Sequence, residues 1–153
     1  MTSFKTFSWR FAEYYRGVRV LVTGAGGFIG SHLVEALATA GAEVRAMIRY
    51  SSRADAGNLE FLPSAIRQRV EIVRGNLGDP QFMLEVCAGR DIVFHLGALI
   101  GIPYSYQAAF DYVTTNVVGT VNVLEAARRS GVKRLVHTST SEVYGTAQYR
   151  PID

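Results

Sequence analysis

The stretch from Val18 to Leu33 constrains the fold of this chain more strongly than any other part of the sequence. Val18–Val22 is almost entirely β-branched or aliphatic, as expected for a strand that is covered on both faces of a sheet. Gly24, Gly27 and Gly30 follow at three-residue spacing, and apolar residues then recur at helical spacing. The stretch therefore predicts a buried strand, a tight glycine turn and the start of a helix.

The predicted turn is suited to binding a phosphate group. Gly24 permits a backbone angle that other residues resist, and Gly27 lacks the Cβ that would keep a phosphate away from the backbone. Gly30 lets the helix pack closely against the strand. The helix begins near Phe28 and Ile29, where unpaired N–H groups and a partial positive charge favour a pyrophosphate. A plain strand-to-helix turn without a ligand is the alternative interpretation.

Length and composition describe an ordinary globular domain. The chain has 153 residues, of which 48% are hydrophobic and 19% charged, and we expect one domain. Its net charge is +3, but the basic residues are scattered, which argues against nucleic acid as a partner. Cys87 is the one cysteine, so we expect no internal disulfide and no cysteine-based metal site. The apolar neighbours of Cys87 predict a buried, structural thiol.

The N-terminal residues 1–16 differ in composition from the domain expected at 17–153. They are rich in aromatic side chains, namely Phe4, Phe7, Trp9, Phe11, Tyr14 and Tyr15. We favour a cap that packs on the edge of the sheet over a contact with a partner subunit. Neither a secretory signal nor an apolar run of membrane-spanning length is apparent, so a cytoplasmic location without membrane attachment is the default expectation.

Beyond the glycine turn, strand patterns alternate with helical patterns. The first helix is expected to end at Gly41, strands are expected at 43–48, 70–73, 91–96 and 134–138, and helices at 59–62, 82–88 and 110–130. Asp79 is the expected N-cap of the helix at 82–88, with Pro80 at the first helical position. In the long helix at 110–130, one face is lined by Val113, Val117, Val121, Leu124 and Ala127.

This alternation predicts an α/β fold, a doubly wound parallel sheet with helices on both faces. In such sheets, ligands bind beyond the carboxyl ends of the strands, where the strand order reverses. Four segments should then meet at one crevice: the glycine turn and the loops after Ile48, Leu96 and Thr138.

The end of the second predicted strand bears on which dinucleotide binds. In an NAD site, an acidic residue about 20 residues beyond the glycines holds the ribose hydroxyls. Here that region holds Arg49, with Arg53 close by. Since arginine pairs well with a 2′-phosphate, we favour NADP over NAD. The alternative is a solvated arginine beside a bound NAD.

Polar residues are also concentrated after the last predicted strand, in the loop Ser139–Gly145. Its hydroxyl groups can hydrogen-bond a sugar or polarise a carbonyl. The carboxylate of Glu142 can remove a proton that a neighbouring ketone has made acidic. The alternative is a capped turn in which Glu142 is solvated.

Three motifs together resemble the extended short-chain dehydrogenase/reductases, the nucleotide-sugar epimerase/dehydratase family. Thr23–Leu33 is similar to the family fingerprint TGxxGFIGSHL. Thr115–Ala127 resembles the long central helix of the family, and Gly131–Ser139 resembles its fifth strand. The resemblance begins near Arg16 and runs to the last residue. It implies a Rossmann-like fold and an NAD(P) cofactor.

The resemblance also implies further cofactor contacts at Leu96, Asn116 and Thr138. Two pairs of residues depart from the family pattern. Asn76 and Leu77 stand where the family usually has Asp-Ile or Asp-Leu, so an adenine contact becomes an amide. Gly97 and Ala98 stand where the family often has two alanines. Both pairs are still expected to contact the cofactor.

Within the family, Thr140–Gly145 is similar to the loop of sugar-nucleotide 4,6-dehydratases. The resemblance implies that Thr140 orients the sugar 4-hydroxyl and that Glu142 is the base for elimination across C5 and C6. Ser141 stands where some dehydratases have an aspartic acid. UDP-glucuronate decarboxylases share a similar run, and sugar 4-epimerases are a further alternative. The resemblance thus implies a nucleotide-sugar substrate and is compatible with a homodimer.

A final departure concerns the Tyr-x-x-x-Lys pair of the family. Gln148 stands four residues after Tyr144, and no other tyrosine of the chain has a lysine at that spacing. We therefore expect cofactor binding, but no turnover, from this chain alone. A non-catalytic nucleotide-binding module is the competing class of function.

Overall fold

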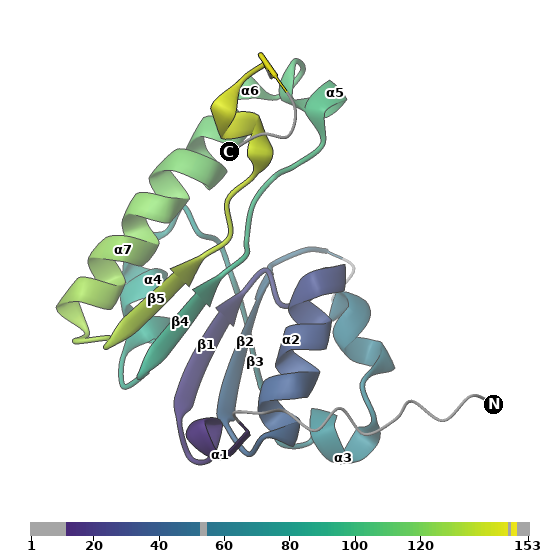
Figure 1. Ribbon diagram of the computed structural model, residues 1–153, viewed down its shortest axis with the longest axis vertical. Coiled ribbons are helices and arrows are strands. Elements are labelled where there is room, and N and C mark those ends of the chain that lie inside the picture. The colour runs from purple at the N-terminus through teal and green to yellow at the C-terminus, as the bar shows by residue number, and fades with distance from the viewer. Residues whose placement is uncertain (1–11, 53–54, 147, 150–153) are drawn as a thin grey trace.

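A computed structural model describes residues 12–52, 55–146 and 148–149 of the chain. In this part, five parallel strands form one sheet with helices on both faces (Figure 1). The strands are β1 (Arg19–Thr23), β2 (Glu43–Arg49), β3 (Glu71–Gly75), β4 (Ile92–His95) and β5 (Arg134–His137). The α-helices are α1 (Ala12–Tyr15), α2 (Phe28–Thr39), α3 (Ser64–Arg67), α4 (Pro80–Cys87), α5 (Ile102–Ser105), α6 (Ala109–Tyr112) and α7 (Gly119–Arg129). Two short 3₁₀-helices, η1 (Gly57–Phe61) and η3 (Ser141–Tyr144), and one π-helix, η2 (Val113–Val118), complete the fold.

The strand order β3-β2-β1-β4-β5 confirms the predicted doubly wound, Rossmann-like fold. The chain moves outward from β1 to β2 and β3, and then crosses to β4 and β5 on the other side of β1. The order therefore reverses between β1 and β4, and their carboxyl ends mark the expected ligand crevice. Thr23 of β1 pairs with His95 of β4, which in turn pairs with His137 of β5.

The alternation of side chains along β1 divides the core into two layers. Val20 and Val22 are fully buried in the cluster that α2 and η1 cover. Leu21 lies on the opposite face, in the cluster that α4 and α7 cover. Burying each such side chain contributes roughly 1.5–3 kcal/mol. Cys87 belongs to this second cluster and is fully buried, which raises the pKa of its thiol to about 11 and confirms the predicted structural role.

The helix boundaries follow the local chemistry of the sequence. Gly41 lies just beyond α2 with a φ of +87°, a backbone conformation that side chains with a Cβ rarely adopt. The side chain of Asp79 accepts hydrogen bonds from the backbone N–H groups of Gln81 (3.0 Å) and Phe82 (3.1 Å). Pro80 is the first residue of α4, so the predicted cap and first position are both confirmed.

Three details differ from the sequence prediction. Helix α3 follows Pro63, where no helix was expected, and α5 begins inside the predicted loop at 97–103. The long helix expected at 110–130 consists of α6, η2 and α7 in direct succession, and its middle part is a π-helix. The π-helix carries Asn116, whose contacts are described below.

The predicted apolar face of the long helix is mostly exposed. Val113, Val117, Val121 and Leu124 are 49–57% exposed, and Ala127 is buried. The residues of α7 that pack into the second cluster are instead Val123 and Ala126. The helix therefore buries the stripe next to the predicted one, because the small residues Gly119, Ala126 and Ala127 allow a closer approach on that side.

The described part of the N-terminal extension begins at Ala12. Tyr15 and Val18 pack, partly buried, against the first core cluster, while Tyr14 is exposed. The other aromatic residues of the predicted extension, at positions 4, 7, 9 and 11, lie outside the described residues. Within the described ranges, no helix combines the length and apolar character needed to cross a membrane.

Candidate cofactor and substrate site

The glycine turn after β1 is packed so closely that two of its glycines tolerate no side chain. Gly24 has a φ of +67°, and a Cβ at this position would lie 2.8 Å from the backbone nitrogen of Gly97. A Cβ on Gly30 would collide with the carbonyl oxygen of Gly24. A Cβ on Gly27 would meet only that same oxygen, at 3.3 Å, and Gly27 is exposed. Gly24 and Gly30 thus shape the turn, while Gly27 leaves open space beside it.

The first turn of α2 offers free hydrogen-bond donors. Gly27 is the N-cap and supplies no side-chain cap, and its own N–H donates to the carbonyl oxygen of Gly24 at 3.1 Å. The backbone N–H groups of Phe28, Ile29 and Gly30 have no acceptor among the described residues. Phe28 and Ile29 are also exposed. These donors, at the positive end of a helix dipole, fit the pyrophosphate of a dinucleotide.

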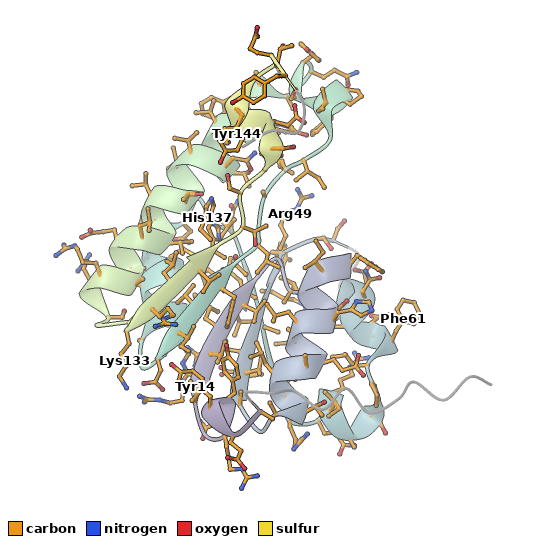
Figure 2. The ribbon with its side chains drawn as sticks, viewed as in Figure 1. Tyr14, Arg49, Phe61, Lys133, His137 and Tyr144 are labelled. Atoms are coloured by element: carbon orange, nitrogen blue, oxygen red, sulfur yellow. The ribbon has the colours of Figure 1, made fainter. Side chains whose placement is uncertain are left out.

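Arg49 ends β2 and is exposed at the carboxyl edge of the sheet (Figure 2). Its side chain has no hydrogen-bond or ion-pair partner within residues 12–52, 55–146 and 148–149. The guanidinium is therefore available to an anionic group, and the predicted contact with a 2′-phosphate stays a prediction. Arg53, the second predicted contact in this loop, lies outside the described residues.

Asn76 and Leu77 follow β3 and differ in their exposure. Asn76 is exposed, and its side-chain oxygen accepts a hydrogen bond from the backbone N–H of Gly78 at 2.9 Å. Leu77 is 8% exposed, and its carbonyl oxygen accepts from the side-chain amide of Asn122 at 2.9 Å. The Leu77 side chain lies directly under Gly97, where an added Cβ would approach it to 3.0 Å. Leu77 thus supports the loop after β4 from below.

The loop after β4 is held by a buried hydroxyl from β1. The Thr23 side chain is fully buried, and its oxygen accepts hydrogen bonds from the backbone N–H groups of Leu96 (3.2 Å) and Gly97 (3.1 Å). The same oxygen lies 2.7 Å from Nδ1 of His95, which is 1% exposed. Ala98, the next residue, is exposed toward solvent. The backbone at the start of this loop is therefore held by the buried Thr23 hydroxyl.

Asn116 holds the far end of the same loop. Its side-chain oxygen accepts from the backbone N–H of Leu99, and its side-chain nitrogen donates to the carbonyl oxygen of Leu99, both at 2.8 Å. Both polar atoms of the amide are thus engaged by the loop. Asn116 lies in the π-helix η2, so this irregular turn carries the amide that binds Leu99.

The segment after β5 carries the predicted acid–base residues. The backbone N–H of Thr138 donates to the carbonyl oxygen of His95, so this strand end lies beside the loop after β4. The Thr140 hydroxyl accepts from the backbone N–H of Glu142 at 3.3 Å and caps η3. Ser141 and Glu142 are exposed on η3. Figure 2 shows Tyr144 of η3 beyond the carboxyl edge of the sheet, the edge at which Arg49 lies.

The structure thus gathers the predicted site residues at one edge of the sheet. The glycine turn, Arg49, the loop after β4 and the segment after β5 follow neighbouring parallel strands at their carboxyl ends. Sequence reasoning missed His95 and its polar contacts. The sequence held one signal, a histidine at the end of an otherwise apolar strand, but its partners Thr23 and Thr120 are known only from the fold. No group of three or more metal-binding side chains occurs in the described part of the chain.

Comparison with known proteins identifies the family. Residues 21–153 match the family model described as GDP-mannose 4,6 dehydratase. The chain belongs to this family. It is 40% identical over 126 residues to a 2-alkyl-3-oxoalkanoate reductase of Stenotrophomonas maltophilia, which covers 82% of the chain and 34% of the reductase. It is 36% identical over 135 residues to the dTDP-glucose 4,6-dehydratase of Streptomyces niveus, covering 84% of the chain and 40% of that enzyme.

Solved structures share the fold of the chain. An epimerase from Methanothermobacter thermautotrophicus superposes with a TM-score of 0.81 at 33% identity, covering 93% of the chain and 41% of the epimerase. MoeE5 in complex with UDP-glucuronic acid and NAD superposes with a TM-score of 0.70 at 37% identity, covering 85% of the chain and 39% of MoeE5. The chain therefore spans about two fifths of the length of these relatives.

Proposed function

We propose that this chain is the NAD(P)-binding part of a sugar-nucleotide 4,6-dehydratase. The observation that carries the proposal is the free donor set at the start of α2, which shares one edge of the sheet with Thr140, Ser141 and Glu142. The donor set fits a pyrophosphate, and the polar segment supplies a carboxylate and two hydroxyl groups for sugar chemistry. The family membership and the dTDP-glucose 4,6-dehydratase relative support this assignment.

A bound NAD(P)⁺ would accept a hydride from C4 of the sugar and return it to C6. The 4-ketone formed in between acidifies the proton on C5. Oxidation at C4 also releases the proton of the 4-hydroxyl to solvent. Glu142 then takes the proton from C5, and the C5–C6 double bond forms as the C6 hydroxyl takes up one proton from solvent and leaves as water. Glu142 returns its proton to C5 when the hydride adds to C6. The net change is the loss of one water molecule, and the product is a 4-keto-6-deoxy sugar nucleotide.

The neighbouring hydroxyl groups hold the sugar in this scheme. Thr140 orients the sugar 4-hydroxyl, and Ser141 hydrogen-bonds the leaving C6 hydroxyl. The Thr140 oxygen already accepts from the backbone N–H of Glu142, so the hydroxyl hydrogen is free to donate to the sugar. This contact also holds the base next to the group that positions the substrate.

Mass spectrometry of sugar nucleotides incubated with NAD(P)⁺ and the 153-residue chain tests the reaction class. Loss of water indicates the dehydratase, loss of carbon dioxide indicates a decarboxylase, and conversion without a mass change indicates a 4-epimerase. In line with the absent Tyr-x-x-x-Lys pair, we expect the chain alone to bind cofactor and to turn over none of these substrates. Turnover by the chain alone would contradict that expectation.

The role of Glu142 is tested in an active protein that continues this sequence. We expect Glu142→Gln to lower dehydration at least about 100-fold, because general acid–base groups contribute about 10²–10⁴-fold. Exchange of the C5 hydrogen with deuterated water, followed by mass spectrometry, measures the proton transfer directly. Glu125→Gln, an exposed carboxylate in α7 that pairs with Arg128, is the matched control and should leave the rate unchanged. Unchanged dehydration and exchange in Glu142→Gln would contradict the role of this residue.

A further inference from the structure

The polar contacts around His95 form one continuous chain across three elements. Nδ1 of His95 lies 2.7 Å from the hydroxyl oxygen of Thr23 in β1, and Nε2 lies 3.1 Å from the hydroxyl oxygen of Thr120 in α7. The His95 side chain is fully enclosed, at 1% exposure. Since a buried polar atom without a partner is costly, both ring nitrogens have to be satisfied by these two hydroxyl groups.

The hydrogen bonds of Thr120 decide which ring nitrogen carries the proton. The Thr120 hydroxyl oxygen lies 2.6 Å from the carbonyl oxygen of Asn116, and a carbonyl cannot donate. The one hydroxyl hydrogen of Thr120 is therefore used on Asn116. Toward His95, the Thr120 oxygen can act as an acceptor only, so Nε2 of His95 carries the hydrogen.

The hydrogen on Nε2 also determines the role of Nδ1, on the opposite side of the ring. With Nε2 protonated in the neutral ring, Nδ1 of His95 is an acceptor and receives the hydroxyl hydrogen of Thr23. The Thr23 oxygen keeps two lone pairs, which accept from the backbone N–H groups of Leu96 and Gly97. Each donor and acceptor in the chain from Asn116 to Gly97 thus has one partner.

This series of hydrogen bonds holds a loop that faces the cofactor crevice. The segment Leu96–Leu99 is held at its start by Thr23 and at its end by the Asn116 side chain. His95 connects the two anchors, because it bonds Thr23 on one side and, through Thr120, the backbone of Asn116 on the other. The backbone of this segment also meets the glycine turn, since a Cβ on Gly24 would lie 2.8 Å from the Gly97 nitrogen.

We propose that His95, as the neutral tautomer protonated at Nε2, is a positioning residue that sets the Gly97–Ala98 loop against the glycine turn and so preorganises the cofactor site. His95 does not touch the cofactor in this arrangement. Its effect passes through the Thr23 hydroxyl, which loses its hydrogen-bond acceptor if the ring is protonated at Nδ1. The part of the proposal that concerns cofactor affinity rests on the proposed function.

The surroundings of the ring favour the neutral form. Burial, and to a lesser extent the charge of His137, lowers the pKa of His95 to about 4. His137 of β5 is the titratable group that the described contacts place against it, with ring centroids 5.2 Å apart. The contacts from β1 and α7 are the hydroxyl groups of Thr23 and Thr120, which stay neutral. The tautomer should therefore persist from about pH 5 to 8.

Long-range proton–nitrogen NMR spectra of the 153-residue chain, labelled with ¹⁵N in its three histidines, test the tautomer directly. The signals of His95 are those that disappear in His95→Leu. We expect the pattern of a neutral ring with hydrogen on Nε2, unchanged between about pH 5 and 8. A ring protonated on Nδ1, or on both nitrogens at neutral pH, would overturn the proposal.

Amide exchange and cofactor affinity test the positioning. In His95→Leu and Thr23→Val, we expect exchange at the Leu96 and Gly97 amides to speed up at least about tenfold and NAD(P)H affinity to fall about fivefold or more, because both variants remove the hydrogen bond between Thr23 and His95. Thr23→Val also removes the acceptor of the two amides. Thr23→Ser retains the hydroxyl and should behave as the wild type. Val123→Ala removes an equally buried side chain of the second cluster and corrects for a general loss of stability.

The outcomes separate this proposal from the proposed function. If His95→Leu and Val123→Ala change exchange and affinity equally, His95 is an ordinary core residue and the positioning role is wrong. If the folded wild type binds neither NADH nor NADPH, the proposed function is wrong, and the amide exchange at Leu96 and Gly97 alone decides whether His95 holds the loop.

Discussion

We expect Arg49, at the carboxyl edge of the sheet, to influence which dinucleotide binds. Arg49 ends β2 as an exposed cation, and no described residue pairs with its guanidinium. Where an acidic residue would bind the ribose hydroxyls of NAD, an arginine instead attracts a 2′-phosphate. MoeE5, one of the structural neighbours, is described with NAD. The two cofactors therefore have to be compared directly on this chain.

We predict that Arg49→Ala weakens the binding of NADPH about tenfold more than the binding of NADH, since a charge-assisted hydrogen bond contributes roughly 1.5–3 kcal/mol. Fluorescence titrations with the two reduced cofactors measure both affinities. Arg129→Ala is the control for the loss of a positive charge, because Arg129 is an exposed arginine at the C-terminal end of α7. An affinity ratio that is the same in the wild type and in Arg49→Ala would refute a phosphate-binding role.

Among the elements, the π-helix η2 has the clearest structural purpose. Its irregular turn carries Asn116, whose side-chain amide makes two hydrogen bonds of 2.8 Å to the backbone of Leu99. The element therefore holds the loop after β4 through this side chain.

We predict that Asn116→Ala lowers the free energy of unfolding by about 1–3 kcal/mol, because it leaves two partly buried backbone groups of Leu99 without partners. Urea unfolding followed by circular dichroism measures the change. Val117→Ala, on the exposed side of the same π-helix, should stay within about 0.5 kcal/mol of the wild type. Equal stability of the two variants would show that the contact with Leu99 contributes nothing.

The elements also show what the sequence could predict. All five strands and the Asp79 cap follow from local patterns, namely apolar runs, capping residues and glycine terminators. The contact between the π-helix and Leu99 does not, because Asn116 and Leu99 are 17 positions apart in the sequence. The buried side of α7 was also misplaced: periodicity identifies an apolar stripe, but here the small residues pack inward and the valines at 117 and 121 face outward.

For the site, the sequence predicted the positions of the residues better than their contacts. The glycine spacing and Arg49 were readable because a strand, a turn and a second strand end are local features. The hydrogen bonds that connect Thr23, His95 and Thr120 could not be predicted, because they join three elements that only the fold brings together. The cofactor and sugar contacts named from the family resemblance stay predictions.

The stability of the whole molecule depends on pH through His95. Burial lowers the pKa of His95 from its ordinary 6.5 to about 4 in the folded chain. Between these values the unfolded chain binds the extra proton and the folded chain does not, so protons favour unfolding. The contribution is complete above about pH 6.5 and is lost as the pH falls toward 4.

We predict that the free energy of unfolding falls by about 3 kcal/mol between pH 6.5 and pH 4 because of His95, at about 1.4 kcal/mol for each pH unit between the two pKa values. Urea unfolding at a series of pH values measures this slope, and His95→Leu should reduce it. The ion pairs of Asp91 with Arg19 and Lys133 hold the pKa of that carboxyl below its ordinary 3.8, so the stability that they contribute is lost mainly as the pH falls below about 3.8. A wild-type stability that is constant from pH 6.5 to 4 would contradict the prediction.

We propose that the start of α2 holds the pyrophosphate of a dinucleotide. A titration of NADH and NADPH fluorescence with the wild type and Gly27→Ala tests this binding. An added Cβ at Gly27 meets only the Gly24 oxygen, at 3.3 Å, and the residue has an ordinary φ of −75°, so the variant should fold. We predict saturable binding of at least one cofactor by the wild type and an affinity at least about tenfold lower in Gly27→Ala, since the Cβ keeps the phosphate from the free N–H groups. Equal affinity in the two proteins, or no saturable binding of either cofactor by the folded wild type, would contradict the claim.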